Sequence, residues 1–281
     1  MIKYKNESNV KIGLVVDSLT KKDAIGNNFI KRKQILEKIG YKTCPILGYT
    51  DYSEFKKNMI LKSITEMINL KSLNKLYSNP KKYLPKAINY LNPLYKRKIA
   101  DCDIYIIDFG SYSKLMETIL KTKKGLKIVD FHGITPIKFT DDKILIADLK
   151  KSKEQLKLLK KADIILTHSE FVQDKIKNLG KSYIAPLALF SNTPSRKNKT
   201  LRDKNKLNIL FVGKISKHKG IHILIEALSA LNTDFECNVV GDYNSYSSKK
   251  YFKELQKQAS SLKLSKKVNF LRSISNEELQ S

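Results

Sequence analysis

The chain has 281 residues, and its 54 lysines and arginines against 27 acidic residues give a formal net charge of +27. At about 150 residues per domain this length predicts two domains or one large one, and the hydrophobic content of 41% argues against wholesale disorder. The apolar runs fall far short of the roughly 20 residues of a membrane span. The first residues lack a sustained apolar stretch, so we expect no signal peptide. The three scattered cysteines argue against a disulfide framework and fit a reducing cytoplasm.

The first predicted element is a buried parallel strand at Lys11–Asp17, a short apolar run rich in β-branched residues. A loop containing Gly26 follows, and helical spacing of apolar residues then predicts a helix over Phe29–Ile39. The remaining strands and helices predicted in this half alternate; they are Asp103–Asp108, Leu126–Phe131, Lys143–Lys161, Asp163–Thr167 and Glu170–Asn178. This alternation predicts a doubly wound α/β domain over residues 1–190.

Residues 54–98 interrupt that pattern. Met59–Leu76 is amphipathic, lysine clusters flank it, and three prolines break the region into pieces. We interpret it as a basic helical insertion packed on the first domain. The alternative is a basic amphipathic surface that rests on anionic lipid.

Residues 191–206 are polar and lysine-rich, which predicts an interdomain linker. Residues 207–281 then resume the alternation, with strands predicted at Leu207–Gly213, Phe235–Gly241 and Lys267–Leu271. This segment is about half a typical domain. We therefore expect a partial second α/β domain whose strands leave apolar side chains poorly covered, namely Leu210, Val212, Val239 and Phe270.

The loop Gly213–Gly220 lies between a predicted strand and a predicted helix. A helix N-terminus offers unpaired N–H groups, Gly213 allows a close backbone approach, and Lys214 and Lys219 add full charges, so the loop suits a diphosphate. It matches neither GxxxxGK[ST] nor GxGxxG, so a P-loop ATPase and a classical dinucleotide site are unsupported.

The chain has four histidines. His218 and His222 are four residues apart, but no third ligand accompanies them, so we expect no metal site there. His132 and His168 each follow a predicted strand, at the end of the sheet where doubly wound proteins bind ligands. In that position His132 could hydrogen-bond a sugar or accept a proton.

Several segments together resemble family-4 glycosyltransferases, which have two facing Rossmann-like domains (the GT-B fold). The segments, in the family's order, are Asp23–Asn27, Phe131–Pro136 (FHGITP), Ala162–Phe171 (ADIILTHSEF), Ile209–Leu228, Val239–Asp242 and Val268–Leu279. The resemblance covers nearly the whole chain. It implies an α/β protein of two Rossmann-like doubly wound domains, the second incomplete, with the nucleotide sugar bound by residues 207–281 and the acceptor on the side of residues 1–190.

The resemblance also implies roles for particular residues. The donor diphosphate would be bound by Gly26, Asn27, Gly213, Lys214 and Lys219, and the nucleotide by Gly241, Asp242 and Ile274. His132 would be catalytic, near the transferred sugar. No metal and no cofactor beyond the nucleotide-sugar co-substrate are expected. The family's acidic motif of two glutamates is absent from the sequence, which leaves an inactive fragment or remnant that binds nucleotide without turnover as the alternative.

The implied activity is transfer of a sugar from a nucleotide-diphosphate sugar to a saccharide or polyprenyl-linked acceptor, with retention, in cell-envelope glycan synthesis. The expected location is the cytoplasm, with the inner face of an anionic membrane as a candidate surface. Nucleic acid is disfavoured as a partner because only five of the 54 basic residues are arginines, the side chain that reads guanine and phosphate with two hydrogen bonds.

Overall fold

The structure is a computed structural model that describes residues 10–20, 24–58, 102–140, 143–187, 206–243, 246–272 and 274. The chain divides into two compact units, Met1–Thr135 with Ala147–Ala188, and Pro136–Ile146 with Leu189–Ser281. Each unit is built around its own parallel sheet, so the predicted α/β class is confirmed.

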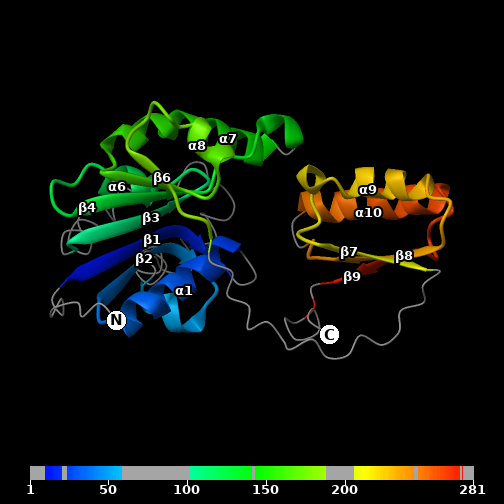
Figure 1. Ribbon diagram of the computed structural model, residues 1–281, viewed down its shortest axis with the longest axis horizontal. Helices are drawn as coiled ribbons and strands as arrows, with labels where there is room; N and C mark the ends of the chain where they lie inside the picture. The colour runs from blue at the N-terminus through cyan, green and yellow to red at the C-terminus, as the bar shows by residue number, and fades with distance from the viewer. Residues whose placement is uncertain are drawn as a thin grey trace, which may run out of the picture. The chain divides into compact units, whose positions relative to one another are not determined.

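The first unit holds a six-stranded parallel sheet in the order β2-β1-β3-β4-β5-β6 (Figure 1). Its strands are β1 (Lys11–Leu19), β2 (Lys42–Thr50), β3 (Ile104–Phe109), β4 (Leu126–Phe131), β5 (Ile164–Thr167) and β6 (Ser182–Ile184). Four of these strands were predicted from their apolar runs, and each lies within two residues of its predicted bounds.

Helical segments cover both faces of this sheet, as a doubly wound fold requires. On one face α1 (Ala24–Lys38) and the 3-10 segment η1 (Ser53–Asn58) pack over Leu14 and Val16, while Val15 points to the other face. That other face is covered by α6 (Lys114–Ile119) and η3 (Leu156–Lys161). The remaining segments of the region are η2 (Ile137–Phe139), α7 (Lys143–Gln155) and α8 (Glu170–Asp174).

The first helix begins earlier than predicted, at Ala24, so Gly26 and Asn27 lie in its first turn and not in a loop. Because Gly26 has no side chain, the first turn of α1 can pack directly against the backbone of Thr20. A Cβ atom at Gly26 would lie 2.6 Å from the carbonyl oxygen of Thr20, which no ordinary side chain tolerates. Gly26 therefore lets α1 start directly beside the end of β1.

Strand β2 was not predicted because Pro45 and Gly48 interrupt its apolar pattern. The proline is tolerated because β2 is an edge strand that pairs with β1 alone, so a missing N–H disrupts no second neighbour.

The second unit holds a three-stranded parallel sheet in the order β7-β8-β9. Its strands are β7 (Leu207–Val212), β8 (Phe235–Val240) and β9 (Val268–Leu271). The helices α9 (Ile221–Ser229) and α10 (Tyr246–Ser261) both lie on the same face of this sheet (Figure 1). A short 3-10 segment, η4 (Lys217–Lys219), precedes α9.

Strand parity decides which apolar side chains of this sheet are covered. Val239 and Phe270 were expected to be poorly covered, and this is wrong: both belong to the core beneath α9 and α10. Leu210 and Val212 have the opposite parity and are 58% and 52% exposed, as expected. Among the described residues, no helix covers the face that carries them.

Within the described ranges, no helix combines the length and hydrophobicity needed to cross a bilayer. Most of the predicted insertion at 54–98, most of the predicted linker at 191–206 and the last residues of the chain lie outside those ranges.

The two faces of the second sheet should respond differently to truncation. Val239→Ala removes buried methyl groups and should lower the free energy of unfolding of this unit by about 2 kcal/mol. Leu210→Ala, on the uncovered face, should change it by less than about 0.5 kcal/mol. Urea unfolding of both variants measures this, and equal losses would show that the open face is packed in solution.

Candidate functional site

Two buried carboxylates lie side by side at the carboxyl end of the first sheet. Asp108 and Asp130 occupy the same register on the neighbouring strands β3 and β4, and are 5% and 1% exposed. Side chains two residues apart on a strand point to the same face, so Asp108 points with Ile106, and Asp130 with Ile128, toward the face that α1 covers. Two buried negative charges on neighbouring strands repel each other and would destabilise the fold unless a cation compensates them.

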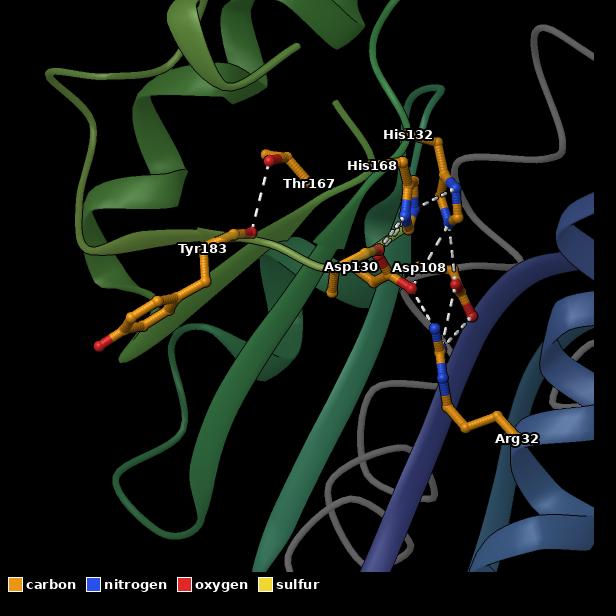
Figure 2. A network of polar contacts seen from close by, with 8 residues as sticks. Arg32, Asp108, Asp130, His132, Thr167, His168 and Tyr183 are labelled. Atoms are coloured by element: carbon orange, nitrogen blue, oxygen red, sulfur yellow. Dashed lines mark hydrogen bonds and ion pairs between the residues drawn. The ribbon is translucent and has the colours of Figure 1, made fainter. Parts of the chain in front are cut away.

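That cation is Arg32 of α1. It stands in the core-facing stripe of the helix, three residues after Phe29 and four before Leu36. Its Nη1 donates to both oxygens of Asp108 at 3.2 and 3.3 Å, and its Nη2 donates to Asp130 Oδ2 (Figure 2). One guanidinium therefore bridges two strands and fixes α1 to the carboxyl edge of the sheet.

Two histidines complete the cluster from the ends of β4 and β5 (Figure 2). His132 Nε2 lies 2.9 Å from Asp108 Oδ1, and the His132 backbone N–H donates to the carbonyl of Phe109. His168 Nδ1 lies 2.8 Å from the carbonyl oxygen of Ala185, just beyond β6. The two rings also contact each other, with His168 Nε2 3.1 Å from His132 Nδ1.

His168 is tied most closely to Asp130, with 3.0 Å between Nε2 and Oδ1. This contact raises the pKa of His168, and it outweighs the opposing effect of burial. Burial alone would raise the pKa of Asp130, but the contact with His168 and the charge of Arg32 hold that pKa below its ordinary value. Asp130 is therefore ionised at neutral pH, and His168 favours its protonated form.

Asp130, His132 and His168 each offer a ligand atom within 4.8 Å of the others, so they are the described residues that could hold a metal ion. Two features disfavour that use. The two facing ring nitrogens already lie at hydrogen-bond distance from each other, and the guanidinium of Arg32 places a positive charge on the same carboxylates.

A third carboxylate of this region, Asp17 near the end of β1, is also perturbed. Burial raises its pKa to about 6, against the lowering effect of hydrogen bonds from Ser113 and from the backbone at the start of α6. Its Oδ2 is buried and has no hydrogen-bond partner among the residues that the structure describes. We assign it no role in the cluster.

In the second unit, the loop Gly213–Gly220 joins β7 to α9 as predicted. Lys214 and Lys219 are exposed on this loop. The pKa of His218 is lowered by partial burial and by the charges of Lys219 and Lys214. His218 therefore favours its neutral form at neutral pH, and the positive charge of the loop comes from its lysines. The loop thus presents exposed cations beside a helix start, the arrangement that suits an anion.

The ends of β7 and β8 approach each other closely at two glycines. A Cβ atom at Gly241 would lie 1.9 Å from the carbonyl oxygen of Gly213, so only glycine fits at Gly241. The backbone then continues the pairing, because Ile215 N–H donates to the Asp242 carbonyl at 3.0 Å. Gly241 and Asp242 therefore support the lysine loop, and Ile274 is half-buried.

The predicted site residues thus fall into two groups. His132 joins the Arg32 cluster in the first unit, where Gly26 and Asn27 start α1, while Gly213, Lys214, Lys219, Gly241 and Asp242 gather at the carboxyl edge of the second sheet. Sequence reasoning missed Arg32, Asp108 and Asp130. The available signal was an arginine within an apolar helical stripe and an aspartate one residue before the end of two apolar strands.

Comparison with known proteins adds a family match. Residues 192–281 match the family described as glycosyl transferases group 1. No protein of curated function matches the sequence.

Solved structures with the same fold include sucrose-phosphate synthase from Thermosynechococcus elongatus, with a TM-score of 0.64 at 14% identity over 97% of this chain and 72% of that one. HepE of Anabaena, in complex with UDP and glucose, gives 0.59 at 16% identity over 95% of this chain and 70% of that one. A glycosyltransferase from Rickettsia africae gives 0.58 at 18% identity, over 95% and 69% of the two chains. The fold is thus that of GT-B glycosyltransferases, and together with the family match it supports a glycosyltransferase.

Removing the central cation should destabilise the first unit. Arg32→Met leaves Asp108 and Asp130 buried and uncompensated, and should lower the free energy of unfolding by about 3–5 kcal/mol. Lys33→Ala, which removes the neighbouring surface pair with Glu37 on the same helix, should cost less than about 1 kcal/mol. Urea unfolding followed by NMR signals of β3 and β4 measures both, and similar losses would mean that the cluster contributes no more than a surface ion pair.

Proposed function

We propose that this protein transfers a sugar from a nucleotide-diphosphate sugar to a saccharide or polyprenyl-linked acceptor, with retention, in the synthesis of cell-envelope glycans. The observation that carries the proposal is the group 1 family match over residues 192–281, because that segment contains the lysine loop. Several neighbours of the same fold were solved with UDP or a UDP-sugar, which favours a UDP-sugar as donor.

The second unit would supply the electrostatics of the reaction. In transfer from a nucleotide sugar, negative charge grows on the diphosphate as it leaves. Lys214 and Lys219, both exposed on a loop that ends at the first turn of α9, are suited to stabilise that charge. Such stabilisation needs no metal ion, and we propose none. By resemblance to the family, Gly241, Asp242 and Ile274 would contact the nucleotide.

The first unit would supply the acceptor side, and by resemblance Gly26 and Asn27 would approach the diphosphate. His132 would lie near the transferred sugar. Both of its ring nitrogens are occupied within the cluster, one by Asp108 and one by His168. A hydrogen bond from this ring to a sugar hydroxyl would therefore have to replace one of those two contacts.

We propose a cytoplasmic location, with contact to the inner face of the membrane. The support is the net charge of +27, which attracts anionic lipid, and the chemistry of a polyprenyl-linked acceptor.

Lys219→Ala tests the proposed donor site. Loss of a charge-assisted contact worth about 1.5–3 kcal/mol should weaken UDP binding roughly 10- to 150-fold. Lys249→Ala, which removes an equally exposed charge from α10, is the matched control and should leave UDP affinity unchanged. Isothermal titration calorimetry measures both variants, and an unchanged affinity in Lys219→Ala would remove this lysine from the site.

Turnover is tested separately by release of nucleoside diphosphate from a panel of nucleotide sugars with saccharide and polyprenyl-linked acceptors. Sugar transfer by the purified chain is the expected result. UDP binding without transfer to any acceptor would instead support the nucleotide-binding alternative.

A further inference from the structure

The four ring nitrogens of His132 and His168 each face a defined partner, and this fixes where their protons lie. The carbonyl oxygen of Ala185 can only accept, so His168 Nδ1 carries a hydrogen. Asp108 is bridged by Arg32 and accepts as a carboxylate, so His132 Nε2 carries a hydrogen as well. Two protons are therefore assigned by their acceptors alone.

The remaining two nitrogens face each other. His168 Nε2 and His132 Nδ1 are 3.1 Å apart, and Asp130 Oδ1 lies 3.0 Å from the same Nε2. If neither nitrogen were protonated, two lone pairs and a carboxylate oxygen would converge without a hydrogen between them. A third proton between the rings removes this repulsion. Asp130 draws it to the His168 side, because the negative oxygen Asp130 Oδ1 lies 3.0 Å from His168 Nε2.

Three protons on two rings make one positive charge, and the charge balance of the cluster agrees with that count. Asp108 and Asp130 contribute two negative charges, and Arg32 and the histidine pair contribute two positive ones. The described groups that face the pair are these three side chains, from α1, β3 and β4, and the Ala185 carbonyl. With the extra proton the buried cluster is neutral, and without it one negative charge is uncompensated.

We infer that His132 and His168 share one extra proton at neutral pH, and that His168 is the positioning residue that holds the His132 ring with Nε2–H on Asp108 and Nδ1 toward His168. The effect of this positioning on sugar transfer rests on the proposed function, whereas the shared proton does not.

The sign of the pH dependence follows from the raised pKa of His168. A group that binds its proton more tightly in the folded state stabilises the fold below its unfolded pKa, about 6.5 for histidine. That stabilisation is lost as the pH rises through the higher folded value.

The experiment is ¹⁵N NMR of the histidine rings in the 281-residue chain, whose four histidines give a simple spectrum. We expect the His168 ring to lose the extra proton in one step above the ordinary histidine pKa. His218 should titrate below it in the same sample and serves as the internal reference. Two neutral rings at pH 7, or independent titration of His168 near 6.5, would overturn the shared proton.

Two variants test the roles of the partners. Asp130→Asn should lower the titration midpoint of the pair by about one pH unit or more, because the stabilising carboxylate is gone. If that variant does not fold, the wild-type titration alone decides the shared proton. His168→Asn should remove the His168 Nε2 contact at His132 Nδ1, so the ¹⁵N shift of Nδ1 should move toward that of a ring nitrogen without a hydrogen bond, while Nε2–H stays on Asp108. An unchanged His132 Nδ1 shift in His168→Asn would refute the positioning role.

Turnover provides a separate readout. In His168→Asn the kcat should fall about tenfold, the order of one lost orienting hydrogen bond, with the KM for the nucleotide sugar unchanged. The wild-type rate should decrease as the pH rises through the raised pKa of His168, and this decrease should be absent in the variant. An unchanged kcat and pH profile would contradict an effect on catalysis. If the wild-type chain transfers no sugar, the proposed function fails, and the NMR results still decide the shared proton and the positioning of His132.

Discussion

The first unit depends on one ionic contact, the bridge from Arg32 to Asp108 and Asp130. The two aspartates are neighbours in register on adjacent parallel strands, and both are buried. Without a cation the carboxyl edge of the sheet would hold two desolvated like charges. Arg32 supplies that cation from the inner stripe of α1, and Gly26 allows α1 to start close enough to β1 for the helix to lie there. The histidines that follow β4 and β5 then complete a cluster with no net charge.

In the second unit, a steric constraint shapes the strand ends that support the lysine loop. Gly241 and the Gly213 carbonyl approach so closely that a single added carbon would overlap, and this contact joins the ends of β7 and β8 beneath the lysine loop. Lys214 and Lys219 on that loop are exposed, in contrast to the half-buried Arg32. The Arg32 cluster therefore pairs its charges internally, while Lys214 and Lys219 present exposed positive charge, as an anion site requires.

Much of the fold could be predicted from the sequence, because buried parallel strands are continuous apolar runs such as Leu126–Phe131. Strand β2 could not be predicted, since an edge position is what makes Pro45 acceptable and the order of strands is not local information. The sequence also does not show which face of the second sheet the helices cover. Val239 and Phe270, on the covered face, were therefore wrongly grouped with Leu210 and Val212 on the uncovered one. For the candidate site, the histidines after strands pointed to the sheet edge where the Arg32 cluster lies. The aspartates and the arginine that surround those histidines could not be predicted. The contact between Arg32 and Asp130, for example, joins residues 98 positions apart and leaves no spacing pattern in the sequence.

The central claim is that the lysine loop of the second unit binds the diphosphate of a nucleotide sugar. Its most direct test is to map backbone amide shifts while UDP-glucose is added to the intact protein. We expect saturable shifts at the amides of Gly213–Gly220 and of Gly241. The amides near Leu210, on the uncovered face of the second sheet, should not shift. Shifts that avoid the loop, or no saturable shift at millimolar UDP-glucose, would contradict it.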